Sequence, residues 1–172
     1  MSKDSADQST FNDLISANKE YAENFKYRDL TGSAAKGLAI VTCMDSRINP
    51  LSVVGMRSGD AKILRNAGAR VTEDVLRTLV LATYLLNVDR ILVMPHTDCR
   101  MAQSDESAIH DLIEKQFGVD TRSLEFRVTK DQEAALKTDI TRIRAYPLLR
   151  EGVSVIGAIY DVKSGAIDFK DF

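Results

Sequence analysis

The segment LAIVTCMDSR, residues 38–47, carries most of the information about the architecture of this chain. Its first six residues form a short apolar run rich in β-branched side chains, which is typical of a strand buried on both faces of a parallel sheet. The run ends in the polar residues Asp45, Ser46 and Arg47. Because open α/β sheets bind ligands beyond the carboxyl ends of their strands, we expect ligand-binding or catalytic residues at this end of the segment.

Similar apolar runs alternate with amphipathic helices along the rest of the chain. We predict further strands at 61–64, 90–95, 153–160 and 166–169, the last two joined as a hairpin. We predict helices at 9–25, at 72–87 behind the cap Thr72, at 104–117 before Gly118, and from a capping box of Thr129 and Gln132 to residue 145. This alternation predicts an α/β fold: a three-layer, open, mostly parallel β-sheet with an antiparallel edge strand and helices on both faces.

Composition favours one globular domain over residues 1–172, with residues 1–9 as a flexible tail. A chain of 172 residues that is 44% hydrophobic can bury a core without a disulfide or a structural metal. If the protein binds a metal, we therefore expect that metal to take part in catalysis. The 23 Lys and Arg residues against 25 Asp and Glu form no basic block, which argues against nucleic acid as a partner. The polar start and the lack of a long apolar run argue against a secretory signal and a membrane partner. We therefore expect a cytoplasmic protein with reduced thiols.

The cysteines and histidines of the sequence are Cys43, His96, Cys99 and His110. Cys43 ends one predicted strand, and His96 and Cys99 follow another, so a parallel sheet can bring the three to one crevice. Two thiolates and one imidazole form a zinc ligand set that leaves a fourth position open, as in catalytic sites. The residues alone also allow buried apolar cysteines or a Cys43–Cys99 disulfide, which a reducing compartment disfavours. We interpret His110 as a structural histidine rather than a proton shuttle.

Charged residues near these three side chains add to the case for a site. Asp45 and Arg47 can form a paired acid and base beside the open metal position, although a loop ion pair of small energetic value is the plainer interpretation. Asp98, between His96 and Cys99, either orients His96 or is solvated on its loop. A nucleotide-binding domain is disfavoured, because no G-x-G-x-x-G or Walker pattern follows the strands.

Three segments of the sequence resemble a known family. They are CMDSR at 43–47, RNAG at 65–68 and HTDC at 96–99, which in order and spacing look like the signatures of the β-class carbonic anhydrases, most of all their small microbial branch. The resemblance covers residues 10 to 170 and implies a Zn²⁺ site made by Cys43, His96 and Cys99. It also implies a homodimer, or a higher even oligomer, in which an extended N-terminal helix packs on the other subunit.

The activity that the resemblance implies is the reversible hydration of carbon dioxide to bicarbonate and a proton by a zinc-bound hydroxide. Asp45 would orient the hydroxide, and Arg47 would keep Asp45 ionised and aimed away from the metal. The family also has a closed state, in which the aspartate becomes the fourth metal ligand. Two alternatives are a hydrolase of carbonyl sulfide or carbon disulfide on the same site, and a non-catalytic zinc- or anion-binding homologue.

The resemblance also indicates which residues line the substrate pocket. They are Ser46, Asn66, Ala67, Gly68 and Arg100. The residues alone also allow a turn-forming role for Ser46 and a simple strand-to-helix turn at 66–68. Gly68 would allow the backbone to approach the metal crevice closely. Arg100 departs from the family pattern, which has glycine after the second ligand cysteine. A long cation there would narrow the pocket mouth, attract anions or point to solvent.

Overall fold

The computed structural model describes residues 8–172, which form two compact units, one ending at Thr31 and the other spanning Gly32–Phe172. Each unit is described by itself. Among the described helices, none has both the length and the apolar character that crossing a bilayer requires. Of the predicted tail, residues 1–7 lie outside the described residues, and Gln8 and Ser9 belong to the short 3₁₀-helix Gln8–Phe11.

The first unit contains helix α1, Asn12–Glu23, inside the predicted range 9–25. None of its residues is buried, and apolar side chains such as Leu14 and Tyr21 are exposed. The Phe25 ring lies 5.6 Å from the ring of Tyr21 and 5.9 Å from that of Tyr27. An amphipathic helix that buries nothing is compatible with packing on a second subunit, which stays a prediction.

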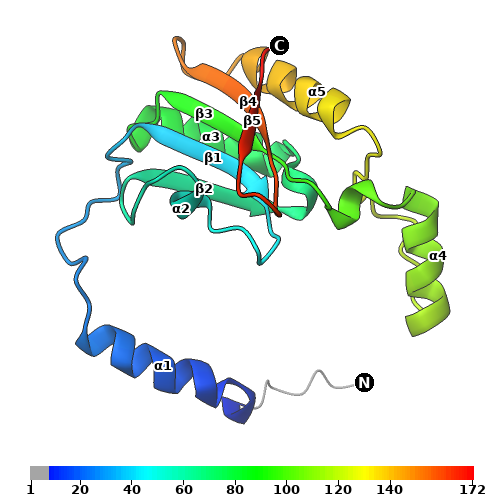
Figure 1. The fold of residues 1–172 in the computed structure, drawn as a ribbon, viewed down its shortest axis with the longest axis horizontal. Helices are drawn as coiled ribbons and strands as arrows, with labels where there is room; N and C mark the ends of the chain where they lie inside the picture. The colour runs from blue at the N-terminus through cyan, green and yellow to red at the C-terminus, as the bar shows by residue number, and fades with distance from the viewer. Residues whose placement is uncertain (1–7) are drawn as a thin grey trace. The chain divides into compact units, whose positions relative to one another are not determined.

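The second unit is built on a five-stranded sheet in the order β2-β1-β3-β4-β5 (Figure 1). The strands are β1 Leu38–Cys43, β2 Ala61–Asn66, β3 Arg90–Met94, β4 Ser154–Tyr160 and β5 Ile167–Lys170. All neighbouring pairs are parallel except β4 and β5, which are antiparallel. The predicted α/β fold with an antiparallel edge strand is confirmed. Since the chain leaves β1 toward β2 on one side and returns to β3 on the other, the switch point of the topology lies beside β1.

One face of the sheet is covered by helices α3, Glu73–Leu85, and α5, Gln132–Arg144. The core between these helices and the sheet includes Val41, Leu76, Leu79, Ile91, Val93, Leu136 and Ile140. Each such large apolar side chain contributes about 1.5–3 kcal/mol by leaving water. On β4, a Cβ at Gly157 would lie too close to Ile140 Cδ1, so α5 packs closely on this strand where it has no side chain.

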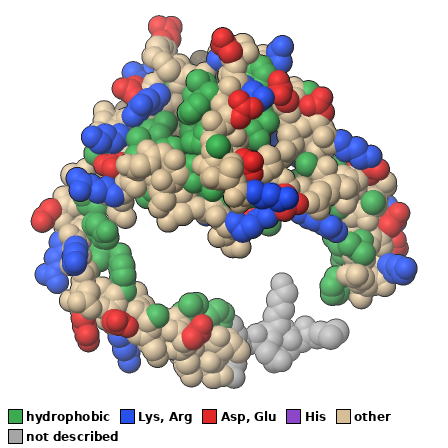
Figure 2. All heavy atoms as spheres, in the orientation of Figure 1, with side chains coloured by type: hydrophobic (Ala, Val, Ile, Leu, Met, Phe, Trp, Pro, Cys, Tyr) green, Lys and Arg blue, Asp and Glu red, His purple; other side chains and the backbone are tan. Residues whose placement is uncertain are grey.

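The other face of the sheet carries the short helix α2, Pro50–Val53, and its flanking loops. Pro50 suits the first helical position, and the Asn49 side chain accepts a hydrogen bond from the Ser52 N–H at 3.3 Å. Ile40, Leu92 and Met94 form a second core on this face together with Cys43 and Cys99. The side chains of both cysteines therefore belong to a packed layer. Figure 2 shows hydrophobic side chains over the sheet, between groups of charged ones.

Helix α4, Glu106–Phe117, lies outside the two cores of the sheet and is held by the segment that follows it. The helix ends at Gly118 in a left-handed conformation (φ +68°), as predicted. The Glu106 carboxylate accepts hydrogen bonds from the N–H groups of Phe126 and Val128. His110 is buried here, with Nδ1 2.8 Å from Thr121 Oγ1 and its ring 5.0 Å from that of Phe126.

The N-terminus of α5 differs from the sequence prediction. Thr129 does not cap it; Asp131 does, with its carboxylate accepting a hydrogen bond from the Ala134 N–H at 2.9 Å. The predicted capping box also needed the Gln132 amide to turn back to the cap. That amide instead donates to the backbone carbonyl of His96 at 2.9 Å, a contact 36 positions away that no local pattern encodes.

Candidate metal centre

Cys43, His96 and Cys99 lie together at the carboxyl end of the sheet. One ligand atom from each of them lies within 4.8 Å of the others. The three residues are buried, with 5%, 1% and 3% of their surfaces exposed. The structure thus brings together the three side chains that were predicted from the sequence as metal ligands. His110 is not among them, and its Nδ1 contacts Thr121 instead.

The pairing of the strands explains why these residues meet. β1 lies between β2 and β3, with Cys43 opposite Asn66 and Thr42 opposite Met94. The buried Thr42 hydroxyl donates to the Met94 carbonyl at 2.7 Å and ties the two strand ends together. Beyond β3 the chain stays against β4, because the Thr97 N–H donates to the Tyr160 carbonyl at 2.9 Å. His96 is therefore held in an extension of the sheet rather than on a free loop.

The ring of His96 is arranged as a metal ligand. Nδ1 lies 2.8 Å from the Thr97 carbonyl, which can only accept, so Nδ1 carries the proton and Nε2 has the free lone pair. Nε2 is buried and has no hydrogen-bond partner among the described residues. A buried nitrogen without a partner is costly, and a metal ion held with the two sulfur atoms would satisfy it. The donor set fits zinc.

Both cysteines are free thiols in the structure. The neighbouring Cys99 thiol lowers the pKa of Cys43, with smaller contributions from His96 and the backbone of Gly68, against the effect of burial. The same contact, together with burial, raises the pKa of Cys99. The pair therefore loses its first proton easily and holds the second, as coupled sites do. A divalent cation would stabilise both thiolates and displace that second proton.

Asp45 is directed at Arg47, two residues along the chain. Its carboxylate accepts hydrogen bonds from Nε at 3.0 Å, Nη2 at 2.7 Å and the backbone N–H at 2.9 Å of Arg47. The side chain and backbone N–H of Arg47 hold the pKa of Asp45 well below its usual range. Asp45 Oδ2 also lies 3.7 Å from His96 Nε2, so this ionised carboxylate borders the cluster.

Sequence reasoning missed the part that Arg65 plays in shaping this loop. Its guanidinium donates to three backbone carbonyls: Cys43 at 2.8 Å, Asp45 at 2.5 Å and Ile48 at 3.3 Å. Arg65 thus holds the loop that carries both a candidate ligand and the Asp45–Arg47 pair. Its place in the RNAG segment was the one available signal, because the carbonyls that it binds are 17 to 22 positions away.

The predicted pocket residues take different positions. Asn66 holds the turn after β2, with its side chain accepting from the Arg70 N–H at 2.9 Å and donating to the Arg70 carbonyl at 2.7 Å. Ala67 and Gly68 form this turn, where Gly68 has φ +76° and a Cβ would lie 3.2 Å from Met101 Cβ. Ser46 and Arg100 are exposed. Ser46 lies in a turn closed by the Ile48 N–H and the Asp45 carbonyl, which agrees with its interpretation as a turn residue.

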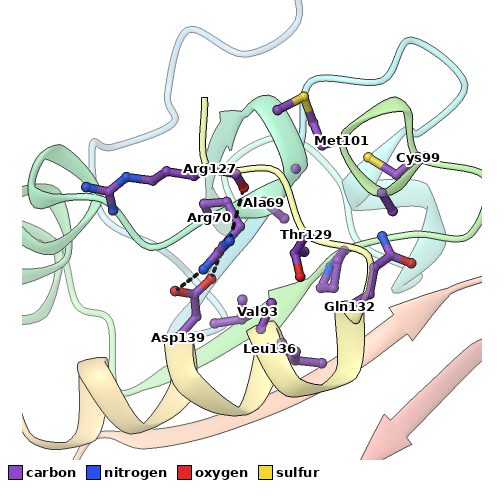
Figure 3. Close-up of a pocket in the computed structure, with 14 residues that line it drawn as sticks. Ala69, Arg70, Val93, Cys99, Met101, Arg127, Thr129, Gln132, Leu136 and Asp139 are labelled. Carbon is purple, nitrogen blue, oxygen red and sulfur yellow. Dashed lines mark hydrogen bonds and ion pairs between the residues drawn. The ribbon is translucent and has the colours of Figure 1, made fainter. Parts of the chain in front are cut away.

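A small pocket lies behind Cys99, between the turn after β2 and helix α5 (Figure 3). Cys99 lies at one end of this pocket, and the ion pair of Arg70 and Asp139 lies at the other, with Nε 2.7 Å from Oδ2. Arg70 also donates to the Arg127 carbonyl at 3.1 Å. With the Gln132 bond to the His96 carbonyl, these contacts fasten α5 and the segment before it to the back of the cluster.

Comparison with known proteins places the chain in a family. A family model described as carbonic anhydrase matches residues 38–167. Beta-carbonic anhydrase 1 of Mycobacterium tuberculosis is 32% identical, over 91% of this chain and 94% of that protein. The crystal structure of carbonic anhydrase from Streptococcus mutans aligns with a TM-score of 0.87 at 35% identity, over 94% of this chain and 97% of that one. The carbon disulfide hydrolase of Saccharolobus solfataricus is 29% identical, over 83% and 81% of the two chains. The extent of these matches shows that the chain belongs to the β-carbonic anhydrase family.

Proposed function

We propose that the chain holds Zn²⁺ through Cys43, His96 and Cys99 and catalyses the reversible hydration of carbon dioxide to bicarbonate and a proton. The observation that carries the proposal is the buried His96 Nε2, which lies within 4.8 Å of two cysteine sulfur atoms and has no hydrogen-bond partner among residues 8–172. Three protein ligands leave one tetrahedral position for the reacting water.

When bound, zinc supplies a Lewis acid that lowers the pKa of its water from 15.7 to about 7. The chain's own residues then orient the reaction. Asp45 can accept a hydrogen bond from the reacting water at Oδ2, which fixes the direction of the oxygen lone pair that attacks carbon dioxide. Arg47 keeps this carboxylate ionised and turned to one side. Thr97 fixes the tautomer of His96 that leaves Nε2 free.

We further propose a homodimer of single-domain chains, with α1 packed on the partner, and a cytoplasmic location. The exposed apolar side chains of α1 support the first proposal, because an amphipathic helix is stabilised mainly when its apolar face packs on another surface. The need for reduced Cys43 and Cys99 as thiolate ligands supports the second.

Purified protein is expected to contain stoichiometric zinc and to accelerate carbon dioxide hydration in a stopped-flow assay with a pH indicator. Chelation should abolish the activity, and added zinc should restore it. Release of sulfide from carbon disulfide is measured in parallel, because one relative is a carbon disulfide hydrolase. If the zinc-loaded protein hydrolyses carbon disulfide and does not hydrate carbon dioxide, carbon disulfide is the substrate instead. If it has neither activity, the chain is a non-catalytic zinc-binding protein.

Arg100 provides a prediction about anions. Its side chain is exposed and makes no hydrogen bond or ion pair with another residue of the described chain, although it directly follows Cys99. Arg100→Gly is expected to weaken inhibition by thiocyanate about two- to fivefold at low salt, the scale of a screened, exposed charge. The difference should shrink as ionic strength rises. Equal inhibition constants at low salt would show that Arg100 does not act on the site.

A further inference from the structure

Asp98 stands between the candidate ligands His96 and Cys99, yet its carboxylate binds other partners. Oδ2 accepts a hydrogen bond from Arg47 Nη1 at 2.8 Å, and Oδ1 accepts one from Gln103 Nε2 at 2.8 Å. His96 Nδ1 is already occupied by the Thr97 carbonyl. The contacts therefore do not support the interpretation that Asp98 orients His96.

Arg47 is the centre of the resulting network. Nε and Nη2 bind the Asp45 carboxylate, whereas Nη1 and a second Nη2 contact of 3.1 Å bind the side chain and carbonyl of Asp98. Four contacts of one planar guanidinium thus engage two residues on different loops. Asp45 follows β1 and Asp98 follows β3. Arg47 consequently joins the two loops that carry the candidate metal ligands.

The arrangement limits the motion of Arg47. Its side chain is 46% exposed, and an exposed ion pair with a single carboxylate gains little, because ordering a long side chain costs conformational entropy. Here one ordered conformation of Arg47 binds two carboxylates. The conformational entropy of its side chain is therefore lost once for two interactions. The planar fork of arginine can bind both groups, which a lysine ammonium cannot do with the same geometry.

Asp98 presents its carboxylate to Arg47 from a turn with an uncommon backbone conformation. Its φ is +55°, in the left-handed region that Asp and Asn adopt more readily than most residues. Gln103, just after the 3₁₀-helix Arg100–Ala102, fixes the second carboxylate oxygen. The guanidinium of Arg47 therefore meets a carboxylate whose other oxygen is already held by Gln103.

We propose that Asp98 is a positioning residue that fixes the Arg47 guanidinium and, through it, the Asp45 carboxylate relative to the metal ligands. The inference rests on the proposed function, in which Asp45 orients the reacting water. Asp98 touches neither substrate nor metal in this role. It supplies the fixed second contact that lets Arg47 hold Asp45 in one place.

The test uses Asp98→Asn, which tolerates the left-handed backbone but offers one acceptor oxygen where the carboxylate offers two. In zinc-free protein, NMR should show faster solvent exchange of the Arg47 Nε proton in this variant than in the wild type. In zinc-loaded protein, we expect kcat to fall about tenfold with KM and zinc content unchanged, the scale seen when a residue that supports a ligand is lost. In an Arg47→Lys background, the same substitution should cause little further loss, because the bridge is already broken.

Asp74→Asn is the matched control, since Asp74 forms an exposed ion pair with Arg77 through Nε and Nη2, at 3.1 and 2.6 Å, on α3. It should leave kcat unchanged. An unchanged exchange rate of the Arg47 Nε proton, or an equal loss of kcat in both backgrounds, would overturn the proposal. Wild-type protein without carbon dioxide hydration would instead refute the proposed function, and the exchange measurement on zinc-free protein would still decide the role of Asp98.

Discussion

Replacement of His96 by asparagine is expected to remove zinc from the protein and, with it, the hydration of carbon dioxide. The asparagine amide nitrogen can occupy the place of Nδ1 and keep the bond to the Thr97 carbonyl, so that only the Nε2 ligand is lost. Two thiolates alone hold zinc weakly. Turnover should fall by at least ~10³-fold, because the metal lowers the pKa of its water from 15.7 to about 7. Metal analysis and stopped-flow hydration measure the two effects.

His110→Asn is the control for this substitution. His110 is also buried, and its Nδ1 also has one polar partner, the Thr121 hydroxyl at 2.8 Å. This variant should bind stoichiometric zinc and keep its turnover, although it loses packing of the ring on Phe126. If the His110 variant lost zinc while the His96 variant retained it, the assignment of the metal ligands would be wrong.

Asp45→Ala is expected to leave zinc bound and to lower turnover by about 10²-fold, the lower end of the range for a positioned proton-accepting group. Asp45 is not among the three buried ligands, and in the structure its carboxylate is bound to Arg47. Its loss therefore removes the acceptor that orients the reacting water and leaves the ligands in place. Zinc content and kcat are measured on the same preparation.

Asp120→Ala is the matched control for Asp45→Ala, because the two carboxylates make similar local contacts. Asp120 also accepts hydrogen bonds from the backbone N–H and a guanidinium N–H of the arginine two residues later, Arg122, at 3.0 and 3.1 Å. This pair follows α4 and does not contribute to the metal cluster, so kcat should not change. Unchanged turnover in Asp45→Ala would exclude Asp45 from the mechanism, and loss of zinc would make Asp45 a ligand.

Helix boundaries show where local patterns were sufficient and where they failed. Thr72 caps α3, as predicted, because its hydroxyl has a nearby N–H to accept from, that of Val75 at 3.4 Å. Thr129 and Gln132 have the same spacing pattern as a capping box, but Gln132 is engaged by the His96 carbonyl. The four-residue helix α2 was not predicted, since so short a helix shows no hydrophobic period.

The sequence by itself determined the alternation of strands and helices and the convergence of Cys43, His96 and Cys99. Apolar runs that end in polar residues mark the carboxyl ends of parallel strands, and these ends share one edge of the sheet. Tertiary structure alone decided which side chains support the cluster: Arg65 on three carbonyls and Asp98 on Arg47. Such contacts join residues 17 to 51 positions apart, and their direction depends on side-chain torsions and turns that only the packed chain defines.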